Sequence, residues 1–286
     1  MPTAGEWDEA WKEAQMRLPH KANKVSTDKW CDYWDHTAEA YASQTDADSD
    51  LGNEIIGHLE AEGVLRRSDR GLDIGCGPGT YAFRMAEIAS EVVCLDSSPG
   101  MLDIVRARYT RKNVGNIVPL QQDWSVFSAT ERYDLVFSAF CPAINDLASL
   151  RKMEELSSRW CCLVTIGGAG REHLEYELWD LLRENDYGDY GYDVRFPWNG
   201  LYEQGRRPNL RFFETASEAK AKGEEMVAQY QKYFDMFMDL SEGQKETIKR
   251  HIMSRTRDGI FEASRTYQIA VLYWTVPGDG GAPLSR

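Results

Sequence analysis

The sequence predicts a large α/β domain with additional segments at both ends. Its 286 residues, 42% of them hydrophobic, are enough for a proper core. A short strand-like run at residues 70–74 leads into a glycine-rich turn, and apolar residues then recur at helical spacing from Tyr81. A second strand-like run, residues 91–95, ends in Asp96. A strand that turns into a helix at glycines, followed by another strand, favours the α/β class.

The glycine-rich turn predicts a ligand site. Gly75, Gly77 and Gly79 can adopt positive φ and let a ligand approach the backbone. The helix that begins near Thr80 offers free N–H groups, and Asp96 lies about 20 residues after the glycines, where a nucleotide ribose needs an acceptor.

The residues around the glycines indicate which ligand is bound. The spacing is Gly-x-Gly-x-Gly, whereas dinucleotide enzymes have Gly-x-Gly-x-x-Gly. Asp73 precedes the first glycine by two positions, so its carboxylate would repel a pyrophosphate but would suit an ammonium group. Pro78 removes an N–H that a phosphate would use. These features argue against a nicotinamide-dependent oxidoreductase, and an ordinary glycine turn of another doubly wound protein is the alternative.

This stretch resembles motif I of the class I S-adenosylmethionine (SAM) methyltransferases. The resemblance extends from Cys31 to about Gly168. It implies a Rossmann-like, seven-stranded, mostly parallel sheet with helices on both faces. It also implies SAM as the cofactor and S-adenosylhomocysteine (SAH) as the product. Asp73 would then lie near the methionine end of SAM, and Asp96 would hold the ribose.

Later motifs match the same family in order and spacing. Asp96-Ser97 with Met101-Leu102 resembles the second motif, whose apolar residue flanks adenine, and Asp123-Trp124 would bind the adenine, unless they are a surface acid and a core tryptophan. The fourth strand ends at Ser138, and Phe140 and Cys141 follow it below the transferred methyl group. The cofactor residues implied by the resemblance are Tyr33, Trp34, Asp73, Gly75, Cys76, Gly77, Pro78, Gly79, Thr80, Asp96, Ser97, Met101, Asp123, Trp124, Ser138 and Phe140.

The N-terminal part, residues 1–66, is expected to form a helical cap. An aromatic stripe that includes Tyr33, Trp34 and Tyr41 either packs on the core or, as in many small-molecule methyltransferases, closes over the cofactor and substrate. Residues 42–50 are polar and short-sided, which predicts a loop. Residues 67–168 would form the SAM-binding core.

Beyond Gly168 the resemblance becomes weaker. Residues 169–265 are expected to form a lid or substrate insertion with helices, including a long helix over 217–240, and residues 266–286 a closing strand and tail. Residues 187–213 are rich in aromatic side chains and arginines, which either stack on a flat acceptor and bind its anionic group or balance surface acids around a small extra core. The expected substrate residues are Tyr41, Cys141, Arg195, Trp198, Tyr202 and Arg206.

Methyl transfer from SAM requires that the acceptor lies in line with the sulfonium and that water is excluded, so we expect no catalytic triad. Candidate bases for an acidic acceptor are His36, Asp146 and Tyr202. The alternative for His36 is that it is a surface or lid histidine without a catalytic role. The expected acceptor is a small planar or apolar molecule with an anionic group. The alternatives are a SAM-binding sensor or scaffold without catalysis and thiol-assisted methylation of a metalloid or metal-bound substrate through Cys31 and Cys141.

Charge and cysteine content give the expected partners. A formal net charge of −13 disfavours nucleic acid, whose binding usually needs a basic face. No apolar run is long enough to span a bilayer, and the six cysteines lack zinc-like spacing, so we expect neither a membrane partner nor a metal. We expect a cytoplasmic protein that acts on a small molecule, as a monomer or a homodimer.

Overall fold

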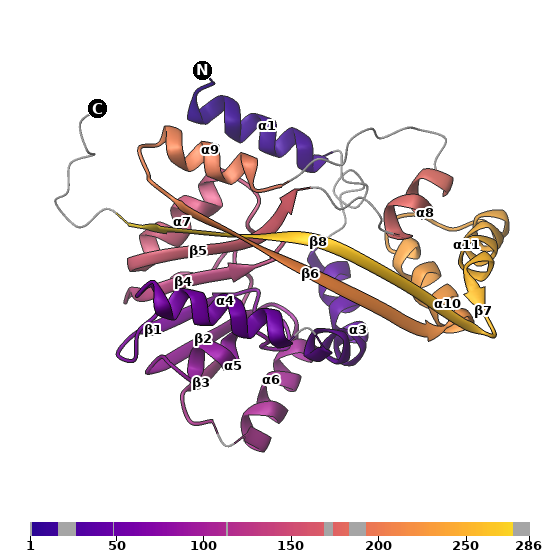
Figure 1. The fold of residues 1–286 in the computed structure, drawn as a ribbon, viewed down its shortest axis with the longest axis horizontal. Coiled ribbons are helices and arrows are strands. Elements are labelled where there is room, and N and C mark those ends of the chain that lie inside the picture. The colour runs from indigo at the N-terminus through magenta and orange to yellow at the C-terminus, as the bar shows by residue number, and fades with distance from the viewer. Residues whose placement is uncertain are drawn as a thin grey trace.

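The fold is built around one mixed sheet (Figure 1). The computed structural model describes residues 2–16, 27–47, 49–112, 114–168, 174–182 and 193–276. The strand order is β3-β2-β1-β4-β5-β8-β6, and β7 pairs with β8. The strands are β1 (Arg70–Ile74), β2 (Glu91–Asp96), β3 (Ile117–Gln121), β4 (Tyr133–Ala139), β5 (Ser157–Gly168), β6 (Asn209–Lys222), β7 (Thr256–Arg257) and β8 (Ile260–Thr275).

The first five strands pair in parallel, and β8 and β6 add to β5 in antiparallel fashion. This confirms the predicted α/β class and the mostly parallel seven-stranded sheet. From β1 the strand order runs outward through β2 to β3, and from β4 it runs through β5 to the other edge. The order therefore reverses between β1 and β4, and sheets of this kind bind ligands at the carboxyl ends of the strands near such a reversal.

Helices cover both faces of the sheet. One apolar cluster joins the sheet to α4 (Ser49–Ala61), α5 (Ala82–Ala86) and α6 (Pro99–Lys112). The other cluster joins it to α1 (Ala4–Met16), α7 (Leu147–Leu156) and α9 (Arg195–Glu203). The pleat of β2 separates the two clusters, because Val92 and Cys94 belong to the first and Val93 and Leu95 to the second.

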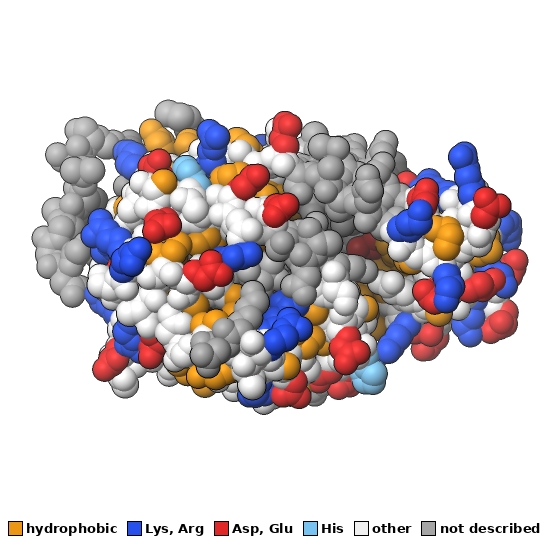
Figure 2. All heavy atoms as spheres, turned by 60° about the horizontal axis from the view of Figure 1, so that its bottom comes forward, with side chains coloured by type: hydrophobic (Ala, Val, Ile, Leu, Met, Phe, Trp, Pro, Cys, Tyr) orange, Lys and Arg blue, Asp and Glu red, His pale blue; other side chains and the backbone are white. Residues whose placement is uncertain are grey.

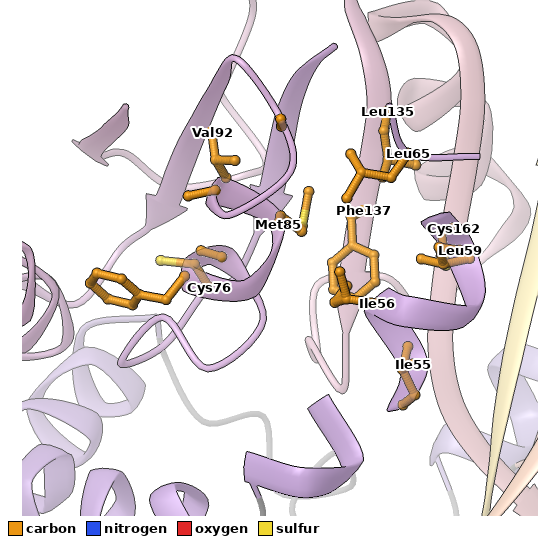
Figure 3. Packing of buried hydrophobic residues seen from close by; sticks show 14 of the residues in the cluster. Ile55, Ile56, Leu59, Leu65, Cys76, Met85, Val92, Leu135, Phe137 and Cys162 are labelled. Carbon is orange, nitrogen blue, oxygen red and sulfur yellow. The ribbon is translucent and has the colours of Figure 1, made fainter. Parts of the chain in front are cut away.

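Figure 3 shows part of the first cluster, in which Ile56 of α4 lies near Phe137 of β4 and Leu59 near Cys162 of β5. Leu59 and Phe137 are fully buried. Burying a side chain of this size stabilises the fold by about 1.5–3 kcal/mol. Helix α4 is therefore a main contributor to the core on this face, and it holds the strands that carry the ligand edge.

The ribbon formed by β6 and β8 extends past the core (Figure 1). Its far end carries α8 (Leu174–Leu182), α10 (Gly223–Asp235), α11 (Glu242–Ser254) and β7, which together we call the distal lobe. The lobe has an apolar cluster of its own, which contains Trp179, Phe234, Ile248, Ile252 and Phe261. Helix α3 (Thr27–Ala47) lies between the core and the lobe (Figure 1).

Several expected elements differ from the structure. The helix expected over 217–240 is wrong at its start, because residues 217–222 belong to β6 and pair with β8. The loop expected at 42–50 is wrong, because α3 continues to Ala47 and α4 begins at Ser49. Strand β8 begins at Ile260, seven positions before the expected start at Tyr267. Residues 187–192 and 277–286 lie outside the described residues.

Residues 195–203 form the short helix α9. Pro197 lies in its first turn, where a helix tolerates proline. No helix among the described residues has both the length and the apolar character required to cross a bilayer.

Candidate active site

A cleft of about 790 Å³ lies at the carboxyl ends of β1, β2 and β4. Residues from the glycine turn, from β2, from the segments after β3 and β4, and from α3 and α7 line it. The residues predicted from sequence that the structure brings together there are Trp34, Tyr41, Gly75, Gly77, Asp96, Ser97, Met101, Asp123, Trp124, Phe140, Cys141 and Asp146.

The glycine turn requires glycine for backbone conformation and for space. Gly75, Gly77 and Gly79 have φ values of 65°, 54° and 84°, in the left-handed region that glycine favours. A Cβ atom on Gly75 would lie 2.5 Å from the Cys141 sulfur. On Gly77, however, it would meet its nearest neighbour, Tyr41, at 3.9 Å. The open backbone at Gly77 therefore allows a ligand to approach closely.

Asp73 lies beneath this turn and is 1% exposed, outside the residues that line the cleft. Its Oδ2 atom is buried and has no hydrogen-bond partner among the described residues. Burial, together with the charge of Asp96, raises the pKa of Asp73 to about 8, although the Ala82 N–H opposes the shift. A buried carboxylate that has one unpartnered oxygen beside a glycine turn fits a ligand that carries an ammonium group.

Asp96 connects the end of β2 to the turn. Its Oδ2 accepts a hydrogen bond from the Gly77 N–H at 2.8 Å, and its Oδ1 accepts from the Ser98 N–H at 2.9 Å. Burial raises its pKa, whereas these backbone N–H groups lower it. Each carboxylate oxygen keeps a second lone pair, so Asp96 retains the capacity to accept from ribose hydroxyls.

Asp123 and Trp124 form the wall after β3. Asp123 Oδ1 accepts from the Ser125 N–H at 2.6 Å. The Trp124 side chain is 8% exposed and stacks on Phe127 with ring centroids 6.2 Å apart. Trp124 therefore packs in the core and also lines the cleft.

Helix α3 is fixed over the cleft by polar contacts. Asp35 Oδ1 accepts from the Gly100 N–H at 3.0 Å and from the Ser98 hydroxyl, at the start of α6. Trp34 and Tyr41 line the cleft, and their ring centroids are 5.2 Å apart. Tyr33 does not line it but contacts Tyr233 of the distal lobe, with centroids 6.0 Å apart.

The end of β4 presents an aromatic ring. Phe140 has a φ of 51°, unusual for a residue other than glycine, and its side chain is 43% exposed. Burial raises the pKa of the Cys141 thiol to about 11. Ser138 does not line the cleft; its hydroxyl donates to the Ile74 carbonyl at 3.1 Å and ties β4 to β1.

Four of the expected substrate residues lie elsewhere. Arg195, Trp198 and Tyr202 belong to α9, which packs against α1. The Arg206 guanidinium donates to both carboxylate oxygens of Glu154, at 2.7 Å each. The structure does not bring these residues to the cleft: Arg195 and Arg206 pair with Asp193 and Glu154, and Trp198 stacks on Tyr202 within α9.

The candidate bases differ in position. His36 is exposed on α3, with Nδ1 2.5 Å from the Asp32 carbonyl oxygen, and it does not line the cleft. Asp146 lines it but caps α7, where its Oδ1 accepts from the Ser149 N–H at 2.7 Å. The remaining predicted cofactor residues, Cys76, Pro78, Gly79 and Thr80, support the turn from outside the lining.

Several lining residues were missed by sequence reasoning. Asn145, Ala148, Ser149 and Lys152 line the cleft from α7 and the residue before its cap. Their spacing places them on one face of a helix, which was the available signal. Cys31, which the sequence indicated together with Cys141 as a candidate thiol, also lines the cleft, and its thiol donates to the Ser97 hydroxyl at 3.4 Å.

The core of the chain is similar to known proteins. Residues 72–159 match a family model described as a methyltransferase domain. An uncharacterized protein of Haemophilus influenzae is 29% identical over 148 residues, which are 51% of this chain and 54% of that protein. This chain therefore spans about half the length of the curated relative that it matches.

A solved structure of a candidate methyltransferase from Bacillus halodurans is similar in fold alone. It is 16% identical, with a TM-score of 0.50, over 77% of this chain and 98% of that one. The match of residues 72–159 covers the glycine turn, Asp96, Asp123 and the end of β4. Residues 72–159 are thus similar to a methyltransferase domain, and the fold is similar to that of the Bacillus halodurans structure.

Proposed function

We propose that this protein transfers a methyl group from SAM to a small-molecule acceptor bound in the cleft. One observation carries the proposal: the glycine turn, Asp96, Asp123 with Trp124, and the end of β4 converge on a single cleft of about 790 Å³. Four separate strands, β1 to β4, lead to these residues, and their ends supply different polar or aromatic groups.

Each group has a part in holding SAM. Asp73 would balance the ammonium of the methionine end, Asp96 would accept from the ribose hydroxyls, and Asp123 with Trp124 would hold the adenine. When bound, SAM supplies an electrophilic methyl group. The chain therefore has to orient the acceptor and exclude water, and Trp34, Tyr41 and Phe140 give the cleft an aromatic cover for this purpose.

The aromatic cover suits a small planar or apolar acceptor. The arginines expected to bind an anionic group do not support that part of the expectation, because Arg206 is paired with Glu154 and Arg195 with Asp193. On the face drawn in Figure 2, basic and acidic side chains of the described residues lie interspersed, which favours a small acceptor over a polyanion.

For an acceptor that must lose a proton, Asp146 is the best-placed of the three candidate bases, because it lines the cleft and His36 and Tyr202 do not. Its carboxylate is shared with the Ser149 N–H and lies 3.6 Å from the Lys12 ammonium. Both contacts engage the carboxylate at the start of α7.

Calorimetry with SAM, SAH and NADH tests the cofactor. We expect dissociation constants for SAM and SAH in the low-micromolar range or below, about −8 kcal/mol, and no heat from NADH. Asp96→Ala should weaken the binding of SAH by about 1.5–3 kcal/mol, because it removes a charged hydrogen-bond acceptor for the ribose. Tight NADH binding without heat from SAM or SAH would contradict the proposal.

Turnover of isotopically labelled SAM with a panel of acceptors tests methyl transfer. SAM binding without turnover on any neutral, anionic or cationic small molecule would favour a SAM-binding sensor or scaffold instead.

A specific observation keeps thiol-assisted methylation as the second candidate, since Cys31 and Cys141 both line the cleft. The raised pKa of Cys141, about 11, keeps this thiol protonated at neutral pH and disfavours metalloid coordination. We therefore expect Cys31→Ser and Cys141→Ser to keep most activity, and complete loss in either would reverse the preference.

A further inference from the structure

Lys152 is the one lysine or arginine among the described residues that line the cleft. Its ammonium donates to the carbonyl oxygen of Trp124, and to that of Ser125 at 3.2 Å. The same nitrogen lies 4.4 Å from the centroid of the Trp124 ring. One side chain of α7 therefore holds both the backbone and the ring face of the wall that follows β3.

Burial lowers the pKa of Lys152, whereas the carboxylates of Asp123 and Glu155 raise it. A partly buried ammonium is favourable where it makes charge-assisted hydrogen bonds. The two carbonyls and the indole supply these contacts, so the side chain is held in one arrangement.

Helix α7 carries Lys152, and the N-terminal end of this helix is anchored to other elements. Asp146 caps the helix, and the Leu147 N–H donates to Asp8 Oδ1 of α1 at 2.7 Å. Gln15 of α1 donates to the Asn145 carbonyl at 2.7 Å. Helix α7 is thus a fixed support, and Lys152 connects it to a turn that lies 28 positions earlier in the chain.

We propose that Lys152 is a positioning residue for adenine recognition: it fixes the Asp123–Trp124–Ser125 turn so that the indole and the Asp123 carboxylate stay in place for the base. This inference rests on the proposed function, in which that turn holds the adenine of SAM. Without the ammonium, the two carbonyls lose their common donor and the indole loses its cation contact, so the adenine wall becomes less ordered.

Calorimetry on Lys152→Met and Lys152→Arg, with SAH and 5′-methylthioadenosine as probes, tests the role. The second probe shares the adenosine of SAH but lacks its amino-acid end. We expect Lys152→Met to weaken both probes by the same factor, about tenfold, and Lys152→Arg to restore most of the loss, because a guanidinium can donate to both carbonyls. Lys249→Met, which changes a lysine on α11 of the distal lobe, is the matched control and should leave both affinities unchanged.

A double-mutant cycle with Trp124→Leu separates positioning from a direct contact. If Lys152 acts through the turn, Lys152→Met should add little to the loss already caused by Trp124→Leu. Additive losses would overturn the proposal, as would unchanged affinities in Lys152→Met or a loss confined to SAH. A loss of the same size in Lys152→Arg would also overturn it. Failure of the unchanged protein to bind SAH would instead defeat the proposed function, and it would be seen before any variant is compared.

Discussion

The core sheet and the β6–β8 ribbon reach their structures in different ways. Strands β1–β4 are short, β1–β5 pair in parallel, and helices follow β1, β2 and β4 directly in sequence. The ribbon pairs Asn209–Lys222 with residues 260–273, and its distal lobe packs around a separate apolar cluster. Local sequence signals therefore determine the cleft, whereas long-range pairing determines the ribbon.

The base of the ribbon is joined to the core by a buried ion pair. The Arg206 and Glu154 side chains are 23% and 8% exposed, and the Trp274 indole N–H also donates to Glu154, at 2.8 Å. Arg206 lies just before β6, Trp274 on β8 and Glu154 on α7. A single substitution in this cluster should therefore lower the stability of the protein without changing ligand binding in the cleft.

The largest expected effect is that of Arg206→Leu. It leaves the Glu154 carboxylate buried without its cation, and losing one partner of a buried pair typically costs about 3–5 kcal/mol of unfolding free energy. Urea unfolding should show this loss, while SAH affinity of the folded variant stays unchanged.

Arg207→Leu is the control, because Arg207 is exposed and its guanidinium lies over the Tyr202 ring, 4.6 Å from the centroid. It should cost no more than about 1 kcal/mol. A specific rise in the acceptor KM in Arg206→Leu, with stability unchanged, would instead return Arg206 to the substrate site.

Substitution of one glycine in the cleft and one beside the ribbon should have different effects on stability. Gly75→Ala combines a φ of 65° with the contact to Cys141 and should cost about 2–4 kcal/mol of stability, together with most of the SAH affinity. Gly205, before β6, has a φ of 82° but nothing within 4 Å of an added Cβ. Gly205→Ala should therefore cost only about 1–2 kcal/mol.

Thermal unfolding and calorimetry on both variants measure this difference. Equal losses of stability, or full SAH affinity in Gly75→Ala, would show that the glycine turn tolerates a side chain.

The pH dependence of SAH binding isolates Asp73. Its pKa of about 8 in the folded protein means that the carboxyl is largely protonated at pH 6 and must ionise to pair with an ammonium. We expect SAH affinity to rise by up to about tenfold per pH unit, or 1.4 kcal/mol, between pH 6 and 8, and then to level off. Asp73→Asn should abolish this rise, and calorimetry at several pH values would measure both proteins.

The stability of the ligand-free protein should change in the opposite direction. The folded-state pKa of Asp73 lies above the usual value of 3.8, so the folded state keeps a proton that the unfolded chain loses. Stability from this group is therefore present below about pH 4 and is lost as pH rises through 8. Asp73→Asn should remove this decline from urea unfolding curves, and an unchanged decline would assign it to another group.

The sequence was sufficient for much of the core and the cleft because the signals there are local. The bounds of β1 were predicted at Arg70 and Ile74, and strands at the positions of β2 and β4 were also predicted. Twelve of the predicted site residues line one cleft, because strand ends in a parallel sheet meet at one edge.

The ribbon was mispredicted because its determinants are distant in sequence. Residues 217–222, Ser-Glu-Ala-Lys-Ala-Lys, include good helix formers, but each pairs with a residue of β8 and the tertiary context overrides the local preference. Arg206 was assigned to the substrate because nothing near it in sequence reveals Glu154, which lies 52 positions earlier.

The smallest expected effect comes from two adjacent residues of α3 that face the two regions. Trp34 lines the cleft, whereas Tyr33 contacts Tyr233 of the distal lobe, and burial raises the pKa of Tyr33 to about 12. Tyr33→Leu removes these ring contacts and should cost about 0.5–1.5 kcal/mol of stability without changing SAH affinity. Trp34→Leu should weaken SAH binding, because it opens the cover of the cleft. Thermal unfolding and calorimetry on the two single variants and on the double variant separate the two effects. The double variant is needed because the centroids of the Tyr33 and Trp34 rings are only 5.2 Å apart, so the two substitutions can influence each other. If Tyr33→Leu weakens SAH as much as Trp34→Leu does, Tyr33 contributes to the cofactor site, and the distal lobe influences the cleft through α3.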